Sequence, residues 1–389
     1  MATLTRVCRG AVLSIAAIAA MGCQSAPSPN IQHSRGHLII AGGATEEHNQ
    51  RVYARFMAPL AADAVIGVIS TASASPAESA DSAARTLALY AGSRRIERIP
   101  LSLQDPTLAS NPATIQLISK CSALWFTGGV QSRITAVFRP PSGDTPAYTA
   151  AAGVLARGGV IGGTSAGAAM MSDPMITGGS SEEALSGKSR GEGEDSGFGM
   201  AQGMGFFPFG LTDQHFLRRG RLGRLIVALE RTGIARGYGV EENSAIDVDL
   251  ASGTITALGP VVLVDVSRMQ KNGQSRVGVR VSLLNDGDVV NGRTGIVGLV
   301  GDKPVTVGAV PRESRSSGPS DPAPPAWSRG AIATALERVA RTGVPVELRS
   351  QAHVVRFSSD ERTVKWTRGG LLSVHDVLME IHAAPGSAP

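Results

Sequence analysis

The chain is poor in the residues that build metal clusters, disulfide frameworks and nucleic-acid surfaces. Its 389 residues include only three cysteines, Cys8, Cys23 and Cys121. Three cysteines cannot form a disulfide framework, and no two of them have the spacing of metal ligands. The formal net charge is only +5 and no long run of Lys or Arg occurs, which argues against a nucleic-acid partner. We therefore expect no metal site built on cysteine and no nucleic-acid partner, and we expect no cofactor.

Aromatic residues are also scarce, at 4% of the chain, while hydrophobic residues as a whole reach 42%. The core must therefore consist mainly of Ala, Val, Ile and Leu, a composition that favours α/β layers. A chain of this length predicts one large domain with an appendage, or two domains.

The first 23 residues are typical of a signal peptide. Arg6 and Arg9 supply the positive region, and the apolar run at 11–21 supplies the hydrophobic region. This run is too short to span a bilayer as a helix. We therefore expect an exported protein.

Export can end in two ways, which the sequence leaves open. Residues 20–22 precede Cys23 in an arrangement similar to a lipoprotein cleavage box, which would leave a lipid anchor on Cys23. Otherwise a conventional peptidase cuts nearby and releases the protein. The polar, Pro/Ser-rich residues 24–35 are interpreted as a flexible tether.

The body of the chain, residues 36–311, begins with apolar runs that alternate with helical patterns. This alternation predicts a parallel sheet covered on both faces by helices. The expected strands are 37–41, 64–70, 95–101, 123–126 and 160–162. In such sheets functional groups gather just past the carboxyl ends of the strands. Glycine pairs mark three of these ends, at 42–43, 128–129 and 162–163.

The pattern changes after residue 240. Short apolar runs at 245–248, 254–258, 261–266 and 276–284 predict hairpins at the edge of the sheet. Residues 312–327 are rich in Ser, Gly and Pro and are interpreted as a linker. A small C-terminal unit, 328–389, follows, and the sequence indicates no chemistry for it.

The strand at 160–162 runs directly into Gly163-Thr-Ser165-Ala-Gly167, which has the G-x-S-x-G pattern of a nucleophile elbow. A serine at such a tight strand-to-helix turn has strained backbone angles, so its neighbours two residues away must be tiny. Ser165 is therefore the candidate nucleophile, with helix N–H groups available to stabilise an oxyanion.

A serine nucleophile needs a general base and a carboxylate that orients it. Of seven histidines, only His215 lies between the first fifty and the last forty residues, which makes it the candidate base. Spacing alone does not choose among the carboxylates. The candidates are Glu182, Glu183, Glu192, Glu194, Asp195, Asp213, Glu241 and Glu242.

Arginines cluster after the candidate base. Arg218, Arg221 and Arg224 are spaced by three residues, so that they could line one helix face, and Arg219 lies among them. Guanidinium groups next to a catalytic base can bind substrate carboxylates. The alternative is an ordinary solvated helix face.

Taken together, these segments resemble the cyanophycinases, in the group of serine peptidases that includes aspartyl dipeptidases. The resemblance covers roughly residues 36–300, and several separate motifs in order are more specific than one elbow. The similar segments are 38–44, 126–129, 161–169, 213–216, 221–225 and 239–245, with Gln131, Arg133 and Arg219.

The resemblance implies a flavodoxin-like, class I amidotransferase-like fold with a doubly wound, mostly parallel sheet. It also implies hydrolysis of cyanophycin, a poly-aspartate backbone with arginine on each β-carboxyl group, to β-Asp-Arg dipeptides without a metal. Ser165 would attack and His215 would transfer the proton. A glutamate in the loop after the nucleophile would complete the triad, with Glu183 expected by position and Glu182 as its close rival.

Further site residues follow from the same resemblance. Backbone N–H groups of Gly129 and Ala166 would form the oxyanion hole. Substrate-binding positions would be Gln131, Asp213, Gln214, Arg219, Arg221 and Arg224. Val130, where relatives often have an acidic residue, and Glu241, in place of an aspartate, depart from the family pattern. A homodimer is a further expectation from the family.

Two other functions fit parts of the sequence. An exported aspartyl or isoaspartyl dipeptidase would use the same triad, although a dipeptide needs fewer pocket groups than the arginine cluster offers. An inactive binding protein is the second alternative, and the presence of both Ser165 and His215 argues against it.

Overall fold

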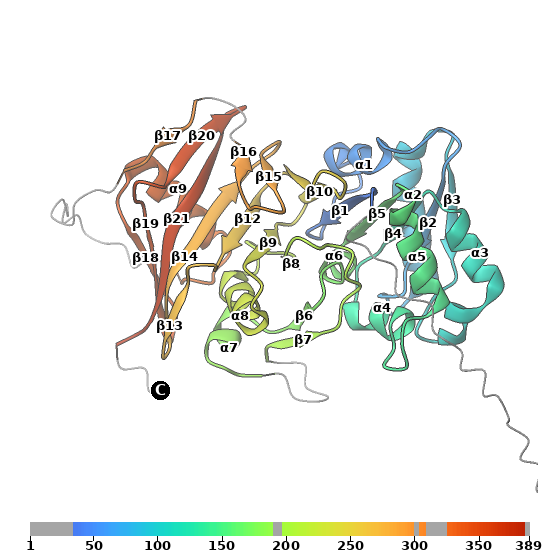
Figure 1. Cartoon of the computed structure of the whole chain (residues 1–389), viewed down its shortest axis with the longest axis horizontal. Helices are drawn as coiled ribbons and strands as arrows, with labels where there is room; N and C mark the ends of the chain where they lie inside the picture. Colours follow the sequence, from blue (N-terminus) through green and yellow to red (C-terminus); the bar gives the residue numbers. More distant parts are fainter. Residues whose placement is uncertain (1–33, 190–196, 299–302, 309–324, 386–389) are drawn as a thin grey trace, which may run out of the picture.

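Two large sheets lie side by side, one covered by helices on both faces and one mainly antiparallel (Figure 1). The computed structural model describes residues 34–189, 197–298, 303–308 and 325–385. The predicted signal peptide, Cys23, nearly all of the tether and most of the linker lie outside these residues, as do Glu192, Glu194 and Asp195. Within the described ranges, none of the helices is both long and apolar enough to cross a membrane.

The first sheet has nine strands in the order β16-β15-β11-β10-β1-β5-β4-β2-β3. Its parallel half contains the predicted strands, which are β1 (His37–Ala41), β2 (Val65–Ile69), β3 (Arg95–Ile99), β4 (Ala123–Phe126) and β5 (Val160–Thr164). The antiparallel half consists of β10 (Ala245–Asp249), β11 (Thr254–Leu258), β15 (Val289–Asn291) and β16 (Val297–Gly298). The α/β architecture is confirmed, whereas the narrower flavodoxin-like assignment stays a prediction.

Helices cover both faces of the parallel half because its apolar strands alternate their side chains between the faces. Ile39 of β1 packs with α1 (Gln50–Met57) and α2 (Pro76–Ala91). Its neighbour Ile40 belongs to the core on the opposite face. That core also includes side chains of α3 (Pro112–Lys120), α4 (Gln131–Phe138) and α5 (Pro146–Ala156), and a short 3-10 helix spans Pro106–Ser110.

The second sheet corrects the predicted edge hairpins. Of the four strands predicted there, β10 and β11 extend the first sheet, whereas β12 (Val261–Asp265) and β14 (Ser275–Leu284) belong to the second. There β12 also pairs with β9 (Arg236–Val240), which runs parallel to β8 (Leu211–Asp213). The chain therefore crosses from one sheet to the other between β9 and β10.

The residues after 325 extend this second sheet. The long strand β21 (Leu371–Ala383) pairs with β14, and its other neighbours are β19 (His353–Ser358) and β20 (Val364–Arg368). The remaining strands are β13 (Gln270–Asn272), β17 (Val305–Thr306) and β18 (Val346–Arg349). Helices α8 (Leu222–Thr232) and α9 (Ala331–Thr342) share one buried core with β14, β18, β19 and β21. The C-terminal residues are thus packed onto the body of the protein, and the exact domain boundaries stay a prediction.

Candidate active site

Ser165 stands at a sharp turn between β5 and the short helix α6 (Ala166–Ala169). Its φ of 55° is in a region that residues with a Cβ rarely adopt. The flanking glycines allow this turn. A Cβ on Gly163 would lie 2.3 Å from the carbonyl oxygen of Gly167, and a Cβ on Gly167 would lie 2.4 Å from that of Phe126. This is the strained strand-to-helix turn that the G-x-S-x-G pattern predicts.

His215 contacts the serine directly. Its Nε2 lies 2.9 Å from Oγ of Ser165, and its backbone N–H donates to the carbonyl of Gly42, 2.7 Å away. Gly43 makes room for the ring, because a Cβ there would lie 2.4 Å from both Cε1 and Nε2 of the imidazole. The glycine pair after β1 therefore holds the histidine that follows β8.

The carboxylate that contacts His215 belongs to Glu242. Its Oε1 lies 2.6 Å from Nδ1 of the imidazole, while Nε of Arg218 lies 3.5 Å from its other oxygen. A carboxylate can only accept a hydrogen bond, so Nδ1 carries the hydrogen and Nε2 is left to accept from Ser165. Glu242 lies in the turn where the chain crosses from β9 to β10.

The expected third member, Glu183, and its rival Glu182 do not contact His215. Both lie on α7 (Ser181–Leu185). Glu183 caps this helix, accepting from the backbone N–H of Ser180 at 2.8 Å and from that of Gly197 at 3.0 Å. Glu182 accepts from the indole N–H of Trp327 at 2.9 Å and so connects α7 to the C-terminal residues.

A signal in the sequence could have narrowed the choice of carboxylate. Ser165 and His215 each follow the carboxyl end of a strand, and so do Glu241 and Glu242, which come directly after β9. Glu182 and Glu183 lie on a helix instead. The rule that functional groups gather past strand ends therefore favours this pair over the position implied by the resemblance, but it does not choose between its two members.

The protonation states suit a charge-neutral base next to a charged carboxylate. Burial lowers the pKa of His215 below its usual 6.5, although the hydrogen bond to Glu242 acts in the opposite direction. Burial alone would raise the pKa of Glu242, but the bond to His215 and the charges of Arg218 and Arg219 lower it overall. At neutral pH, His215 is then able to accept a proton from Ser165.

Of the two predicted oxyanion residues, Ala166 directly follows the serine, and Gly129 follows a glycine that lies against it. Ala166 is the first residue of α6, where a helix leaves its N–H groups without an internal acceptor. Gly128, next to Gly129, would place a Cβ 3.4 Å from that of Ser165. Gly129 itself has φ 139° and would place a Cβ 2.2 Å from the carbonyl of Ala72. Their role as oxyanion donors stays a prediction.

Several of the predicted substrate-binding residues bind one another. Asp213 is buried and accepts two hydrogen bonds from the guanidinium of Arg224, one of them from Nε at 2.7 Å. Arg221 donates to the backbone carbonyl of Gln214. Gln131 donates from its side-chain amide to the carbonyl of Ile176, 2.8 Å away.

Two groups in this set remain available. The guanidinium of Arg219 is exposed, and Oε1 of Gln214 is buried without a hydrogen-bond partner among the described residues. The expected shared helix face of Arg218, Arg221 and Arg224 does not form, because α8 begins only at Leu222.

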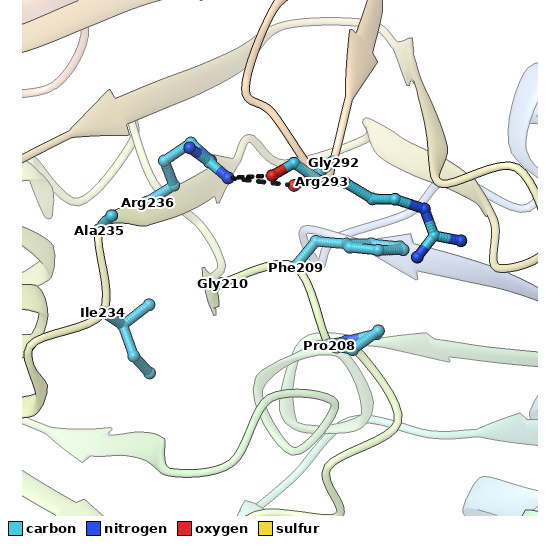
Figure 2. A pocket seen from close by; sticks show the side chains of 8 residues that line it. All are labelled: Pro208, Phe209, Gly210, Ile234, Ala235, Arg236, Gly292 and Arg293. Carbon is cyan, nitrogen blue, oxygen red and sulfur yellow. Dashed lines mark hydrogen bonds between the residues drawn. The ribbon is translucent and has the colours of Figure 1, made fainter. Parts of the chain in front are cut away.

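A separate cavity of about 500 Å³ lies at the other end of β8 and β9 (Figure 2). Its walls include Phe209, Ile234 and Arg236, which come before or at the start of these two strands, whereas His215 and Glu242 follow their ends. Figure 2 shows the guanidinium of Arg236 directed at the carbonyls of Gly292 and Arg293, to which it donates at 3.3 and 2.8 Å. This cavity contains none of the catalytic side chains.

No family model matches the chain. It is similar to the cyanophycinase of Thermosynechococcus vestitus, with 32% identity over 285 residues that cover 68% of this chain and 82% of that protein. The chain belongs to the cyanophycinase family. The cyanophycinase of Geminocystis herdmanii is 29% identical over 277 residues, covering 68% of this chain and 96% of that protein. Family membership makes the chain a hydrolase of the peptidase type.

Among solved structures, the chain is similar to that of a peptidase from an acI-B1 Actinobacterium. It has a TM-score of 0.49 and 14% sequence identity, and it covers 67% of this chain and 98% of the other.

Proposed function

We propose that this cyanophycinase-family protein is an exported enzyme that hydrolyses cyanophycin to β-Asp-Arg dipeptides by Ser-His-Glu catalysis. The observation that carries the proposal is the hydrogen-bonded triad of Ser165, His215 and Glu242, which we also call the catalytic row. It occurs in a chain about 30% identical to proteins named cyanophycinase. The choice of cyanophycin as the substrate rests on the names of those relatives.

The chemistry follows from the row of three residues. Oγ of Ser165 attacks a backbone carbonyl carbon while its proton moves to Nε2 of His215. The oxyanion of the tetrahedral intermediate is stabilised by the N–H groups of Gly129 and Ala166. Collapse of the intermediate breaks the C–N bond, and the leaving amine takes the proton from His215. Water then hydrolyses the acyl-enzyme by the same route, and Glu242 stabilises the imidazolium in both halves.

The charges around the site support a substrate with carboxylates. Arg218 and Arg219 are exposed three and four residues after His215, and a polymer with carboxylate groups would pair with them. Oε1 of Gln214 offers a buried acceptor for a substrate N–H, which would satisfy the hydrogen bond that this oxygen lacks among the described residues.

The test uses purified mature protein and a cyanophycin suspension, with clearing and dipeptide release as measurements. Wild type should clear the suspension and Ser165→Ala should not. A folded wild type that clears nothing but cleaves short aspartyl peptides would establish the dipeptidase alternative. Failure of wild type to react with an active-site serine reagent would favour an inactive binding protein.

Export, a lipid anchor at Cys23 and a homodimer are further parts of the proposal. The signal-peptide pattern of the first 23 residues supports export. Metabolic labelling with a fatty acid, compared between wild type and Cys23→Ala, separates lipidation from release. Sedimentation of the mature protein tests the dimer.

A further inference from the structure

A second pocket, of about 300 Å³, is lined in part by Thr164, the residue that precedes the nucleophile. Most of its lining side chains carry a hydroxyl, and we call it the hydroxyl pocket. These residues are Thr45, Ser79, Ser82, Thr86, Thr127 and Thr164. Tyr53 and Trp125 add two aromatic rings whose centroids are 5.5 Å apart. None of the lining side chains is charged at neutral pH.

The loops that position the catalytic residues also build the hydroxyl pocket. Thr164 directly precedes Ser165, and Thr127 directly precedes Gly128, which lies against that serine. Thr45 comes two residues after Gly43, which lies against His215. The hydroxyl groups of Thr45 and Thr164 are 3.2 Å apart, so the segments that follow β1 and end β5 meet at the pocket wall. A substrate held by Ser165 would therefore have a neighbouring group within reach of the pocket.

The chemistry of the walls favours a planar cation. Hydroxyl oxygens accept hydrogen bonds, and the π-electrons of the largely buried Tyr53 and Trp125 rings attract a nearby cation. The exposed cations that follow His215, Arg218 and Arg219, are not among the lining residues, so nothing in the wall repels a positive charge. A carboxylate would find only neutral hydroxyl donors here, while guanidinium groups are available beside His215.

We propose that the hydroxyl pocket binds the guanidinium group of an arginine side chain carried by the substrate. The inference rests on the proposed function, because cyanophycin carries arginine on every backbone residue. The substrate would then be bound with opposite charges separated, its carboxylates near the arginines after His215 and its guanidinium between hydroxyls and aromatic rings.

Ser82 offers a test by charge. It is exposed, lies on α2 at the pocket and has no part in the catalytic row. With soluble β-Asp-Arg oligomers, Ser82→Lys should raise KM by about fivefold or more through repulsion, and Ser82→Glu should lower KM. Ala88→Lys is the matched control, since Ala88 is exposed on the same helix but does not line the pocket. Equal KM values for Ser82→Lys and Ala88→Lys would overturn the proposal.

A binding measurement separates this proposal from the proposed function. Ser165→Ala protein is titrated calorimetrically with N-acetyl-arginine amide and with its uncharged citrulline counterpart. We expect binding of the arginine compound only, tighter with Ser82→Glu and weaker with Ser82→Lys. Equal binding of the citrulline compound would refute a guanidinium site. If binding follows these expectations while wild type leaves cyanophycin intact, the guanidinium-binding proposal is supported and the proposed hydrolysis of cyanophycin is refuted.

Discussion

Glu242 and His215 are 27 residues apart, yet Oε1 of the glutamate lies 2.6 Å from Nδ1 of the imidazole. They meet because β8 and β9 are parallel neighbours, so that the residues just after both strands emerge at the same end. Ser165 reaches the same place from the other sheet. The catalytic row is thus assembled where the chain crosses between the sheets.

The first prediction concerns the carboxylate. Glu242→Gln should lower kcat by about 10²- to 10⁴-fold, because an amide neither fixes the tautomer of His215 nor stabilises the imidazolium. Glu183→Gln is the matched control and should keep most of the activity, since Glu183 caps α7. The rates are measured on cyanophycin or its soluble oligomers. A larger loss in Glu183→Gln than in Glu242→Gln would contradict this assignment.

The pH profile of kcat/KM should report His215. Activity needs the neutral imidazole, and burial lowers its pKa, so kcat/KM should fall only as pH drops through a midpoint below 6.5. The hydrogen bond that His215 donates to Glu242 raises this pKa, and the charge of Arg219 lowers it. Glu242→Gln should therefore move the acid limb to lower pH and Arg219→Ala to higher pH. Shifts of the same sign in both variants would argue against His215 as the titrating group.

The contact between Gly43 and the imidazole predicts an inactive but folded variant. In Gly43→Ala the new Cβ would lie 2.4 Å from Nε2 of His215, so the ring must move away from Ser165. Gly92→Ala is a control for the backbone, because Gly92 also has a positive φ but its Cβ would meet no atom within 4 Å. We expect loss of activity in the first variant only, with circular dichroism to verify folding. Full activity in Gly43→Ala would show that the loop adapts.

Asp213 should behave as a structural residue. It is paired with the buried guanidinium of Arg224, so Asp213→Asn leaves that charge uncompensated and should cost about 3–5 kcal/mol in the free energy of unfolding. Arg219→Ala, at an exposed position, should change stability by less than about 0.5 kcal/mol. Urea unfolding measures both. A higher KM with unchanged stability in Asp213→Asn would instead support a direct role in substrate binding.

Removal of the residues after Pro311 should destabilise the whole protein. Without β21, the strand β14 keeps β12 but loses its neighbour on the other side, which exposes a sheet edge and part of the core that α8 and α9 share with the second sheet. Trp327 would also no longer contact α7 through Glu182. We expect an aggregating product with increased binding of a hydrophobic dye. A soluble, active truncated protein would show that this segment is a dispensable appendage.

The sequence by itself determined the parallel strands, the elbow at Ser165 and the choice of His215. These depend on local patterns, namely apolar runs that end in glycine pairs, and on the distribution of the few histidines along the chain. Such features need no knowledge of which strands become neighbours.

Only the tertiary structure decided which carboxylate completes the row and where the last third of the chain belongs. Eight carboxylates were compatible with the spacing. Glu242 is the one that contacts His215, because the parallel pairing of β8 with β9 brings the two residues together. The runs at 261–265 and 275–284 are short apolar segments of the kind that edge hairpins also have, so the sequence pattern could not assign them to a second sheet. Strand pairing depends on contacts between residues distant in sequence, and periodicity along the chain does not record these contacts.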